Sequence, residues 1–334
     1  MHEIAQIKVV YLAGTSYCGS TLLAFLLNAH PQVVSIGEAS LHRRGQKKKI
    51  LTYMCSCGSL LVRCAFWTAM FRLVNERGLQ FGAYNWTNDY KYKNALLHRL
   101  FTIYAAQPWL SALQNLTLRR LPFHKNRVAY ANKVNIAFIQ SALQLTGTEV
   151  FFDTSKALLR LAYLQQLPEL DLKVVRVVRD VRAFAHSYKR RGVAVEQAAR
   201  QWRNYQVAVE ALLHPLPGDR VMLLRYEDFC HAPRQWLRQL HTFFGVPPRD
   251  PPETITPSEH HIIGNHMRLQ NITTITANDS WREHLTGVET TRILRIAGDI
   301  NARLGYPPHL REALPGPPGG TGALPARASA PVSG

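Results

Sequence analysis

Cysteines are few in this chain, and long apolar runs are missing. Its 334 residues include only 5 cysteines, too few for a disulfide framework. No stretch approaches the ~18 consecutive apolar residues that a transmembrane helix needs. Residues 1–7 carry Glu3 and lead directly into an apolar strand pattern, which is not typical of a signal peptide. We therefore expect a cytoplasmic protein without a transmembrane segment.

Acidic residues are also scarce. The chain has 22 Asp and Glu residues against 40 Lys and Arg residues, so its formal net charge is +18. This excess favours an anionic partner, which means a phosphate, a sulfate, a nucleic acid or an acidic lipid. Hydrophobic residues make up 46% of the chain. That share is enough for a sizeable core and excludes disorder of the whole chain.

Short apolar runs alternate with helical patterns along much of the chain. Strands are predicted at residues 7–12, 149–153, 172–178 and 221–225. Helices are predicted at residues 156–167, 181–191, 195–213, 233–244 and 288–304. This alternation predicts an α/β sandwich with a mainly parallel central sheet.

Two regions depart from this alternation. Residues 41–145 hold aromatic-rich amphipathic segments and basic runs at 43–49 and 119–127. We interpret them as a mostly helical insertion within a single domain of residues 1–314. Residues 315–334 are rich in Pro, Gly, Ala and Ser, a composition that predicts a disordered tail.

A glycine-bounded loop follows the first predicted strand. It runs from Gly14 to Thr21, and leucines at helical spacing come directly after it. Backbone N–H groups at the start of that helix, with the Ser20 and Thr21 hydroxyls, could hold a phosphate. The spacing resembles G-x-x-x-x-G-K-[ST], but Ser20 stands where nucleotide-binding loops have lysine. On its own, the loop could also be an ordinary turn.

A second candidate anion site lies at the end of residues 172–178. Arg179 ends this strand, and Ser187 follows eight residues later on the next helix. A helix rises ~1.5 Å per residue, so both side chains can converge on one anion. A solvated basic helix would explain Arg190 and Arg191 equally well, but it would not explain an arginine that ends a buried strand.

Together these motifs resemble the sulfotransferases that use 3′-phosphoadenosine 5′-phosphosulfate (PAPS). The matching elements begin with Gly14-x-x-x-x-Gly19-Ser-Thr, with His30-Pro31 and Gly37-Glu38 after it. The others are Asp153-Thr-Ser-Lys156, Arg179-Asp-x-Arg182 with Ser187, Leu224-Arg-Tyr-Glu-Asp228, Gly264-Asn-x-Met-Arg268 and Trp281-Arg282. The resemblance implies a P-loop-type three-layer sandwich. It also implies in-line, metal-independent transfer of a sulfuryl group to a hydroxyl or amine.

The resemblance also assigns residues to the PAPS site, with PAPS as co-substrate. It implies that the loop holds the 5′-phosphate, that Arg179 and Ser187 hold the 3′-phosphate, and that Arg268 closes over the nucleotide. Tyr17 and Cys18 depart from the Arg or Lys and the Ser that are usual in the family. The loop residues assigned to this site are Gly14, Tyr17, Cys18, Gly19, Ser20, Thr21 and Leu22.

The acceptor must lose a proton as it attacks, so the site needs a base. Glu38 is the first candidate, because the resemblance to tyrosylprotein-type sulfotransferases, which have a glutamate at a similar distance from the loop, implies that role. Asp153 is the second candidate, at a strand end beside Lys156. Lys156 could supply the cation that the loop lacks at Tyr17.

We expect no metal site. Cys55, Cys57 and Cys64 supply three ligands at an unusual spacing, whereas structural zinc takes four. Free thiols or a structural turn are therefore the favoured interpretation. The adjacent His260 and His261 indicate a metal site only weakly, because neighbouring side chains in a strand point in opposite directions.

Two other classes of function remain open from the sequence. A P-loop kinase or NTPase would need the missing lysine and a magnesium-binding aspartate at a strand end. A basic nucleic-acid-binding protein would suit the charge, but no RNA- or DNA-binding motif is present, so we expect no nucleic acid. The acceptor could be a small molecule, a carbohydrate or a peptide.

Overall fold

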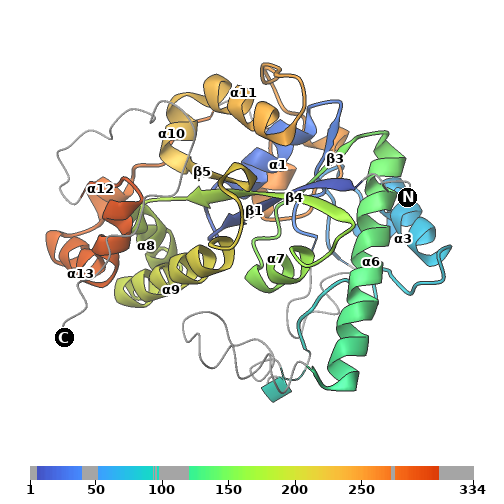
Figure 1. Ribbon diagram of the computed structural model, residues 1–334. Helices are drawn as coiled ribbons and strands as arrows, with labels where there is room; N and C mark the ends of the chain where they lie inside the picture. The colour runs from blue at the N-terminus through green and yellow to red at the C-terminus, as the bar shows by residue number, and fades with distance from the viewer. Residues whose placement is uncertain are drawn as a thin grey trace.

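A computed structural model describes residues 6–39, 52–92, 94, 96–97, 120–271 and 275–307 (Figure 1). The strands are β1 (Ile7–Gly14), β2 (Val33–Val34), β3 (Val150–Asp153), β4 (Leu170–Val178) and β5 (Val221–Arg225). The main helices are α1 (Ser20–Asn28), α3 (Ala65–Asn75), α6 (Pro122–Thr146), α7 (Leu158–Leu164), α8 (Val181–Lys189), α9 (Val195–Leu213), α10 (Tyr226–His231), α11 (Pro233–Phe244), α12 (Trp281–His284) and α13 (Gly287–Arg303).

The five strands form one parallel sheet in the order β2-β3-β1-β4-β5. β1 is central, because it pairs with β3 on one side and with β4 on the other. After Lys8, its residues from Val9 to Gly14 are buried without a break, as expected for a strand that is covered on both faces.

Helices cover both faces of the sheet (Figure 1). Val9 and Tyr11 of β1 lie in one apolar cluster with residues of α3, α6, α7 and α9. Val10 and Leu12 face the opposite cluster, which α1 and α11 complete. The alternation follows from the two-residue period of a strand and produces a three-layer sandwich. A third cluster joins α8, α9, α12 and α13 beside the sheet.

The predicted fold class is confirmed, and most predicted elements lie where the sequence placed them. The largest difference is at α7, which begins at Leu158 and ends at Leu164 rather than spanning 156–167. Lys156 has a φ of 60° and cannot begin a helix. Of the predicted insertion, α3 and α6 are described. The basic residues 43–49 and the tail 315–334 lie outside the described residues.

Among the helices described, none is long and apolar enough to cross a membrane. The parallel arrangement brings the carboxyl ends of β1, β3, β4 and β5 to one edge of the sheet. In open α/β sheets this edge is where ligands bind.

Candidate active site

The loop between β1 and α1 is tightly packed. Gly19 has a φ of 80°, and a Cβ there would lie 2.5 Å from the Tyr226 ring. A Cβ on Gly14 would lie 2.8 Å from the Cys18 sulfur and 3.0 Å from the Val177 carbonyl oxygen. The two glycines therefore allow the loop to pass close to β4 and α10.

Tyr17 and Lys156 are the non-glycine residues with positive φ in the described part of the chain, at 64° and 60°. Such backbone conformations cost free energy and tend to occur at functional sites. Both residues lie at the same edge of the sheet. The hydroxyl of Tyr205 donates to the Lys156 carbonyl at 3.1 Å and helps to hold it there.

Lys156 reaches the loop from the end of β3. Its Nζ donates to Ser20 Oγ at 2.9 Å and to the Thr154 carbonyl at 3.2 Å, and it pairs with Glu38 Oε1 at 2.8 Å. The side chains of Lys156 and Glu38 are 12% and 25% exposed. The structure therefore brings together two predicted catalytic residues and one predicted phosphate-binding residue.

Glu38 is held by its backbone. Its N–H donates to the Ile263 carbonyl at 2.9 Å, and Ile263 N–H donates to the Ile36 carbonyl at 2.8 Å. Gly37 has a φ of 79°, and a Cβ there would lie 1.9 Å from the Ile263 oxygen. Only glycine therefore fits before Glu38. The loop after α11 around Ile263, called the late loop below, fixes the backbone position of Glu38.

Arg179 and Ser187 converge at the end of β4. Arg179 Nη1 lies 3.5 Å from Ser187 Oγ and 2.9 Å from the Tyr17 carbonyl oxygen, to which it donates. The guanidinium also packs over the Tyr226 ring at 5.1 Å and is nearly buried. The strand end thus places a fixed positive charge directly against the loop.

Asp153 has other partners. Its Oδ2 accepts from Arg160 Nε at 2.7 Å, and its Oδ1 accepts from the Ser155 N–H at 2.9 Å. Both Asp153 and Arg160 are almost completely buried. This arrangement favours a structural ion pair and weakens the case for Asp153 as a base.

Arg268 is held within the late loop rather than free to move. Its Nε donates to the Met54 carbonyl at 2.9 Å, and its Nη1 donates to the Gly264 and Asn265 carbonyls at 3.0 and 2.9 Å. The guanidinium also lies 4.3 Å from the centre of the Tyr53 ring. Binding nucleotide through Arg268 would require these contacts to change.

The remaining predicted loop residues divide into two groups. Cys18 and Leu22 are buried in the apolar cluster beneath α1, so their side chains serve packing. Burial raises the pKa of the Cys18 thiol. Thr21 is buried, and its Oγ1 lies 3.3 Å from where a Cβ on Gly264 would be.

Sequence reasoning did not identify every residue at this site. The Arg191 guanidinium packs over the Tyr17 ring at 4.4 Å, and the Tyr188 ring meets Tyr17 edge-on at 5.6 Å. A cation therefore lies beside Tyr17, which stands where the sulfotransferases that the sequence resembles have Arg or Lys. The signal was the pair Arg190-Arg191 at the end of α8, which a solvated basic helix explained equally well.

The motif at residues 224–228 supports the end of β4. Arg225 Nε pairs with Asp228 Oδ2 at 2.6 Å. Glu227 accepts from the Asp180 N–H at 3.2 Å and from the Tyr306 hydroxyl at 2.6 Å. Burial raises the pKa of Glu227 to about 7, although the Tyr306 hydrogen bond acts in the opposite direction.

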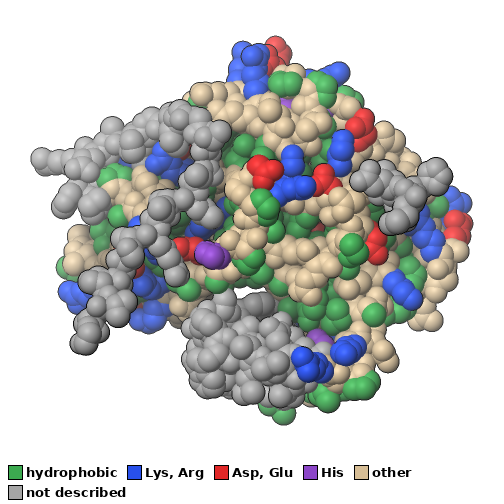
Figure 2. Space-filling view, viewed as in Figure 1, with side chains coloured by type: hydrophobic (Ala, Val, Ile, Leu, Met, Phe, Trp, Pro, Cys, Tyr) green, Lys and Arg blue, Asp and Glu red, His purple; other side chains and the backbone are tan. Residues whose placement is uncertain are grey.

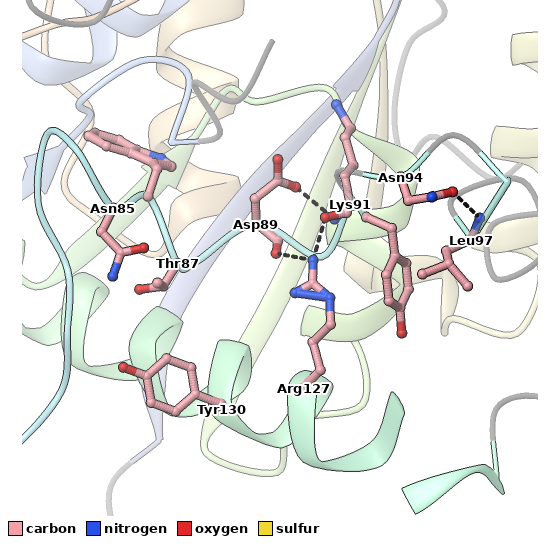
Figure 3. Close-up of a pocket in the computed structure, with 10 residues that line it drawn as sticks. Asn85, Thr87, Asp89, Lys91, Asn94, Leu97, Arg127 and Tyr130 are labelled. Carbon is pink, nitrogen blue, oxygen red and sulfur yellow. Dashed lines mark hydrogen bonds between the residues drawn. The ribbon is translucent and has the colours of Figure 1, made fainter. Parts of the chain in front are cut away.

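Two neighbouring cavities share one lining residue. One, of 290 Å³, is lined by loop residues together with Glu38, Lys156, Tyr188 and Tyr205. The other, of 540 Å³, lies between α6 and residues 85–97 (Figure 3). Lys91 lines both cavities, so they are neighbours.

The larger cavity is lined by amides, aromatic rings and charged groups. Figure 3 shows Arg127 reaching from α6 to the backbone carbonyls of Asp89 and Lys91, to which it donates. The Arg127 guanidinium also lies 4.6 Å from the centre of the Tyr92 ring. Such a mixture of flat rings and hydrogen-bonding groups suits a polar organic ligand.

Aspartates at strand ends do not form an open magnesium site in the described chain. Asp153 pairs with Arg160, and Asp180 pairs with Arg182 at 2.5 Å while capping α8. Each carboxylate is therefore already neutralised by an arginine, which disfavours the kinase alternative. On the face seen in Figure 2, the coloured Lys and Arg side chains lie in separate groups rather than in one stripe.

Comparison with known proteins finds similarity to one family. Residues 101–251 match the sulfotransferase family. Over 168 residues the chain is 27% identical to carbohydrate sulfotransferase 5 of Mus musculus, and this match spans 42% of each protein. These two matches show that the chain is similar to sulfotransferases over part of its length, and it spans less than half of the curated relative.

Solved sulfotransferase domains also align with the chain. The domain from the Synechococcus PCC 7002 olefin synthase has a TM-score of 0.41 at 20% identity, with 94% of each chain covered. The domain from the curacin biosynthetic pathway has a TM-score of 0.47 at 16% identity, and it covers 91% of this chain and 99% of that domain.

Proposed function

We propose that this chain transfers a sulfuryl group from PAPS to a hydroxyl or amine acceptor, in line and without a metal in the reaction. The observation that carries the proposal is that one cation, Lys156, contacts both a residue of the candidate phosphate-binding loop and the candidate base. Lys156 Nζ touches Ser20 of the loop and Glu38 at the cavity. A sulfuryl transfer needs an anion site, a cation and a base at one point, and these three residues supply them.

Unpartnered polar atoms around the loop fit a bound anion. Thr15 Oγ1, Ser155 Oγ and Arg179 Nε are buried and have no hydrogen-bond partner among the described residues. Such atoms are costly unless a ligand or water pairs with them. Within this proposal the loop from Gly14 to Leu22 holds the 5′-phosphosulfate. Arg179 and Ser187 hold the 3′-phosphate, and Arg268 comes over the nucleotide after leaving its present carbonyl partners.

PAPS would supply an activated sulfuryl group and a bisphosphate leaving group. Glu38 takes the proton that the acceptor oxygen loses as it bonds to sulfur. Lys156 and Ser20 donate toward the bridging oxygen, which keeps the electron pair of the broken S–O bond. Because that charge grows during the step, fixed donors stabilise the transition state more than the ground state. Asp153 stays the second candidate for the base, against its pairing with Arg160.

The acceptor site is proposed to be the pair of cavities that meet at Lys91. Glu38 faces the smaller cavity, and the larger one extends away from it along α6. Residues 41–145 then form the acceptor side of a single domain of residues 1–314. Amides and aromatic rings suit a carbohydrate, and the mouse relative is named as a carbohydrate sulfotransferase. We therefore propose a carbohydrate as the first acceptor class.

An acceptor screen tests this proposal. The chain is incubated with PAPS carrying a labelled sulfuryl group and with panels of carbohydrates, peptides and small phenols or amines. We expect labelled carbohydrate product and a raised melting temperature with 3′-phosphoadenosine 5′-phosphate, since a ligand that binds only the folded state stabilises it. No labelled product in any panel, together with no shift from the bisphosphate, would overturn the proposal.

A further inference from the structure

Three cysteines and one histidine that the proposed reaction does not use lie close together in the structure. Cys55, Cys57, Cys64 and His261 each offer one ligand atom, and the four atoms all lie within 4.8 Å of one another. Cys64 Sγ lies 3.3 Å from His261 Nδ1 and 3.6 Å from Cys57 Sγ. Cys55 Sγ lies 3.9 Å from His261 Nδ1. We call this group the Cys-His cluster.

The separations match those of a tetrahedral zinc site. With Zn–S near 2.3 Å and Zn–N near 2.0–2.1 Å, neighbouring sulfurs lie about 3.8 Å apart, and a sulfur and a nitrogen about 3.5 Å apart. The distances of 3.3, 3.6 and 3.9 Å in the cluster lie close to these values. The cysteines are free thiols rather than disulfide-bonded.

We propose that the Cys-His cluster binds one zinc ion in a structural site. Thiolate sulfur and imidazole nitrogen are the ligands that zinc prefers, and three cysteines with one histidine make one of its usual structural sets. Four protein ligands leave no open position for water or substrate. The sequence pattern alone offered three ligands; the fourth, His261, comes from about 200 residues further along the chain and could not be counted with them.

The local backbone is shaped to present these ligands. Gly58 has a φ of 82°, and its N–H donates to the Cys55 carbonyl at 3.0 Å. Cys55 N–H donates to the Ser59 carbonyl at 2.9 Å. This tight turn keeps Cys55 and Cys57 on one side. Cys64 is the residue before α3, so its sulfur lies near the positive end of the helix dipole, which favours a thiolate.

The two adjacent histidines have separate roles. The His261 ring stacks on Phe66 with 4.6 Å between ring centres and 1° between planes. This contact fixes the ring with Nδ1 toward the sulfurs. The His260 ring points elsewhere, since its Nδ1 lies 2.7 Å from Asn28 Nδ2 and the ring packs against Phe25.

A bound ion would join two distant segments that position Glu38. Ser56 N–H donates to the Ile262 carbonyl at 3.2 Å, and Ile262 N–H donates to Ser56 Oγ at 2.8 Å. The next residue, Ile263, pairs with the backbone on both sides of Gly37. Zinc would thus fix the late loop through His261, and the same loop holds the backbone of Glu38 through Ile263. This inference does not depend on the proposed function, because a structural ion takes no part in the transfer.

Metal analysis of the untagged full-length chain tests the inference. We expect about one zinc ion per chain after dialysis. Cys64→Ser and His261→Ala should each lose most of it. The matched control is Cys230→Ser, which removes a buried thiol of α10 outside the cluster and should keep the full zinc content.

Two measurements on the unaltered chain test the inference even if the variants fail to fold. Titration of its thiols with an organomercurial should release one zinc as about three thiols react, and Co²⁺ in place of zinc should give the intense visible bands of a tetrahedral thiolate site. Zinc far below one per chain after exposure to excess Zn²⁺, or a disulfide between Cys57 and Cys64 in the fresh protein, would overturn the inference.

Discussion

Two sides of the loop between β1 and α1 are built differently. On one side, Arg179 is nearly buried, ends a regular strand and donates to the loop backbone at Tyr17. On the other side, Lys156 and Glu38 lie in irregular segments, with side chains partly open to a cavity. A buried arginine held by backbone contacts is suited to binding a fixed anion. A partly open ion pair is suited to meeting an incoming acceptor. Changes on the two sides should therefore separate binding from turnover.

The largest effect is expected for Glu38→Gln. If Glu38 is the base, turnover should fall ~10²–10⁴-fold, because no group then removes the acceptor proton. Affinity for PAPS should stay nearly unchanged, since Gln can still accept from Lys156. Single-turnover kinetics and a binding titration measure the two quantities.

The exposed pair Lys8–Glu149 provides the control for this experiment. Its atoms lie 3.7 Å apart, with side chains 45% and 53% exposed, so Glu149→Gln should leave the rate unchanged. Near-normal turnover in Glu38→Gln would remove Glu38 from the chemistry.

Lys156→Ala should have the next largest effect. Loss of a cation that stabilises charge in the transition state costs ~10²–10³-fold in rate. Unlike Glu38→Gln, this variant should also bind PAPS less tightly, because the sulfonate is anionic before the reaction begins. Lys8→Ala is the matched control. A Lys156→Ala variant that binds PAPS less tightly but turns over at the normal rate would show that Lys156 binds the donor and does not stabilise the transition state.

Glu227→Gln tests whether the buried Glu227 carboxyl, which contacts Asp180 and Tyr306 next to Arg179, contributes to stability. The folded pKa of about 7 lies above the ordinary value of 4.5, so the folded protein binds more protons between these pH values than the unfolded chain. Protonated Glu227 therefore adds to the free energy of unfolding below pH 4.5. This contribution is lost as the pH rises to about 7, by ~3 kcal/mol at most. Urea unfolding across this range should show the slope in the unaltered chain and a flatter profile in the variant. Equal slopes would contradict the assignment.

Arg179→Ala and Ser187→Ala should affect binding alone. Loss of a hydrogen bond to a charged group costs ~1.5–3 kcal/mol, so the Kd for 3′-phosphoadenosine 5′-phosphate should rise about 10- to 150-fold for Arg179→Ala. Ser187→Ala should show the smaller rise. Circular dichroism checks that both variants are folded. Unchanged affinity in both would remove the proposed 3′-phosphate site.

The binding side was largely predictable from the sequence because its residues are local. The loop follows β1 directly, and Arg179 and Ser187 are joined by a single strand–helix junction. Helical spacing alone brings them together. The bounds of α9, β5 and α11 were also predicted correctly, since strong apolar periodicity defines them.

The reacting side was harder to predict because its contacts join distant segments. That Lys156 touches both Ser20 and Glu38 depends on the pairing of β3 with β1 and on the positive φ of Lys156. The fourth member of the Cys-His cluster, His261, comes from the loop after α11. The spacing of apolar residues along the sequence carries no information on contacts between side chains of distant segments. The cytoplasmic location and the absence of a metal in the transfer step stay predictions.

Calorimetric titration of the unaltered chain with three nucleotides tests the central claim most directly. The ligands are 3′-phosphoadenosine 5′-phosphate, adenosine 5′-phosphate and ATP with Mg²⁺. A PAPS-binding site predicts the tightest binding for the bisphosphate, and about 10- to 150-fold weaker binding once the 3′-phosphate is removed. Equal affinity for the first two nucleotides, or tighter binding of ATP with Mg²⁺, would contradict the claim.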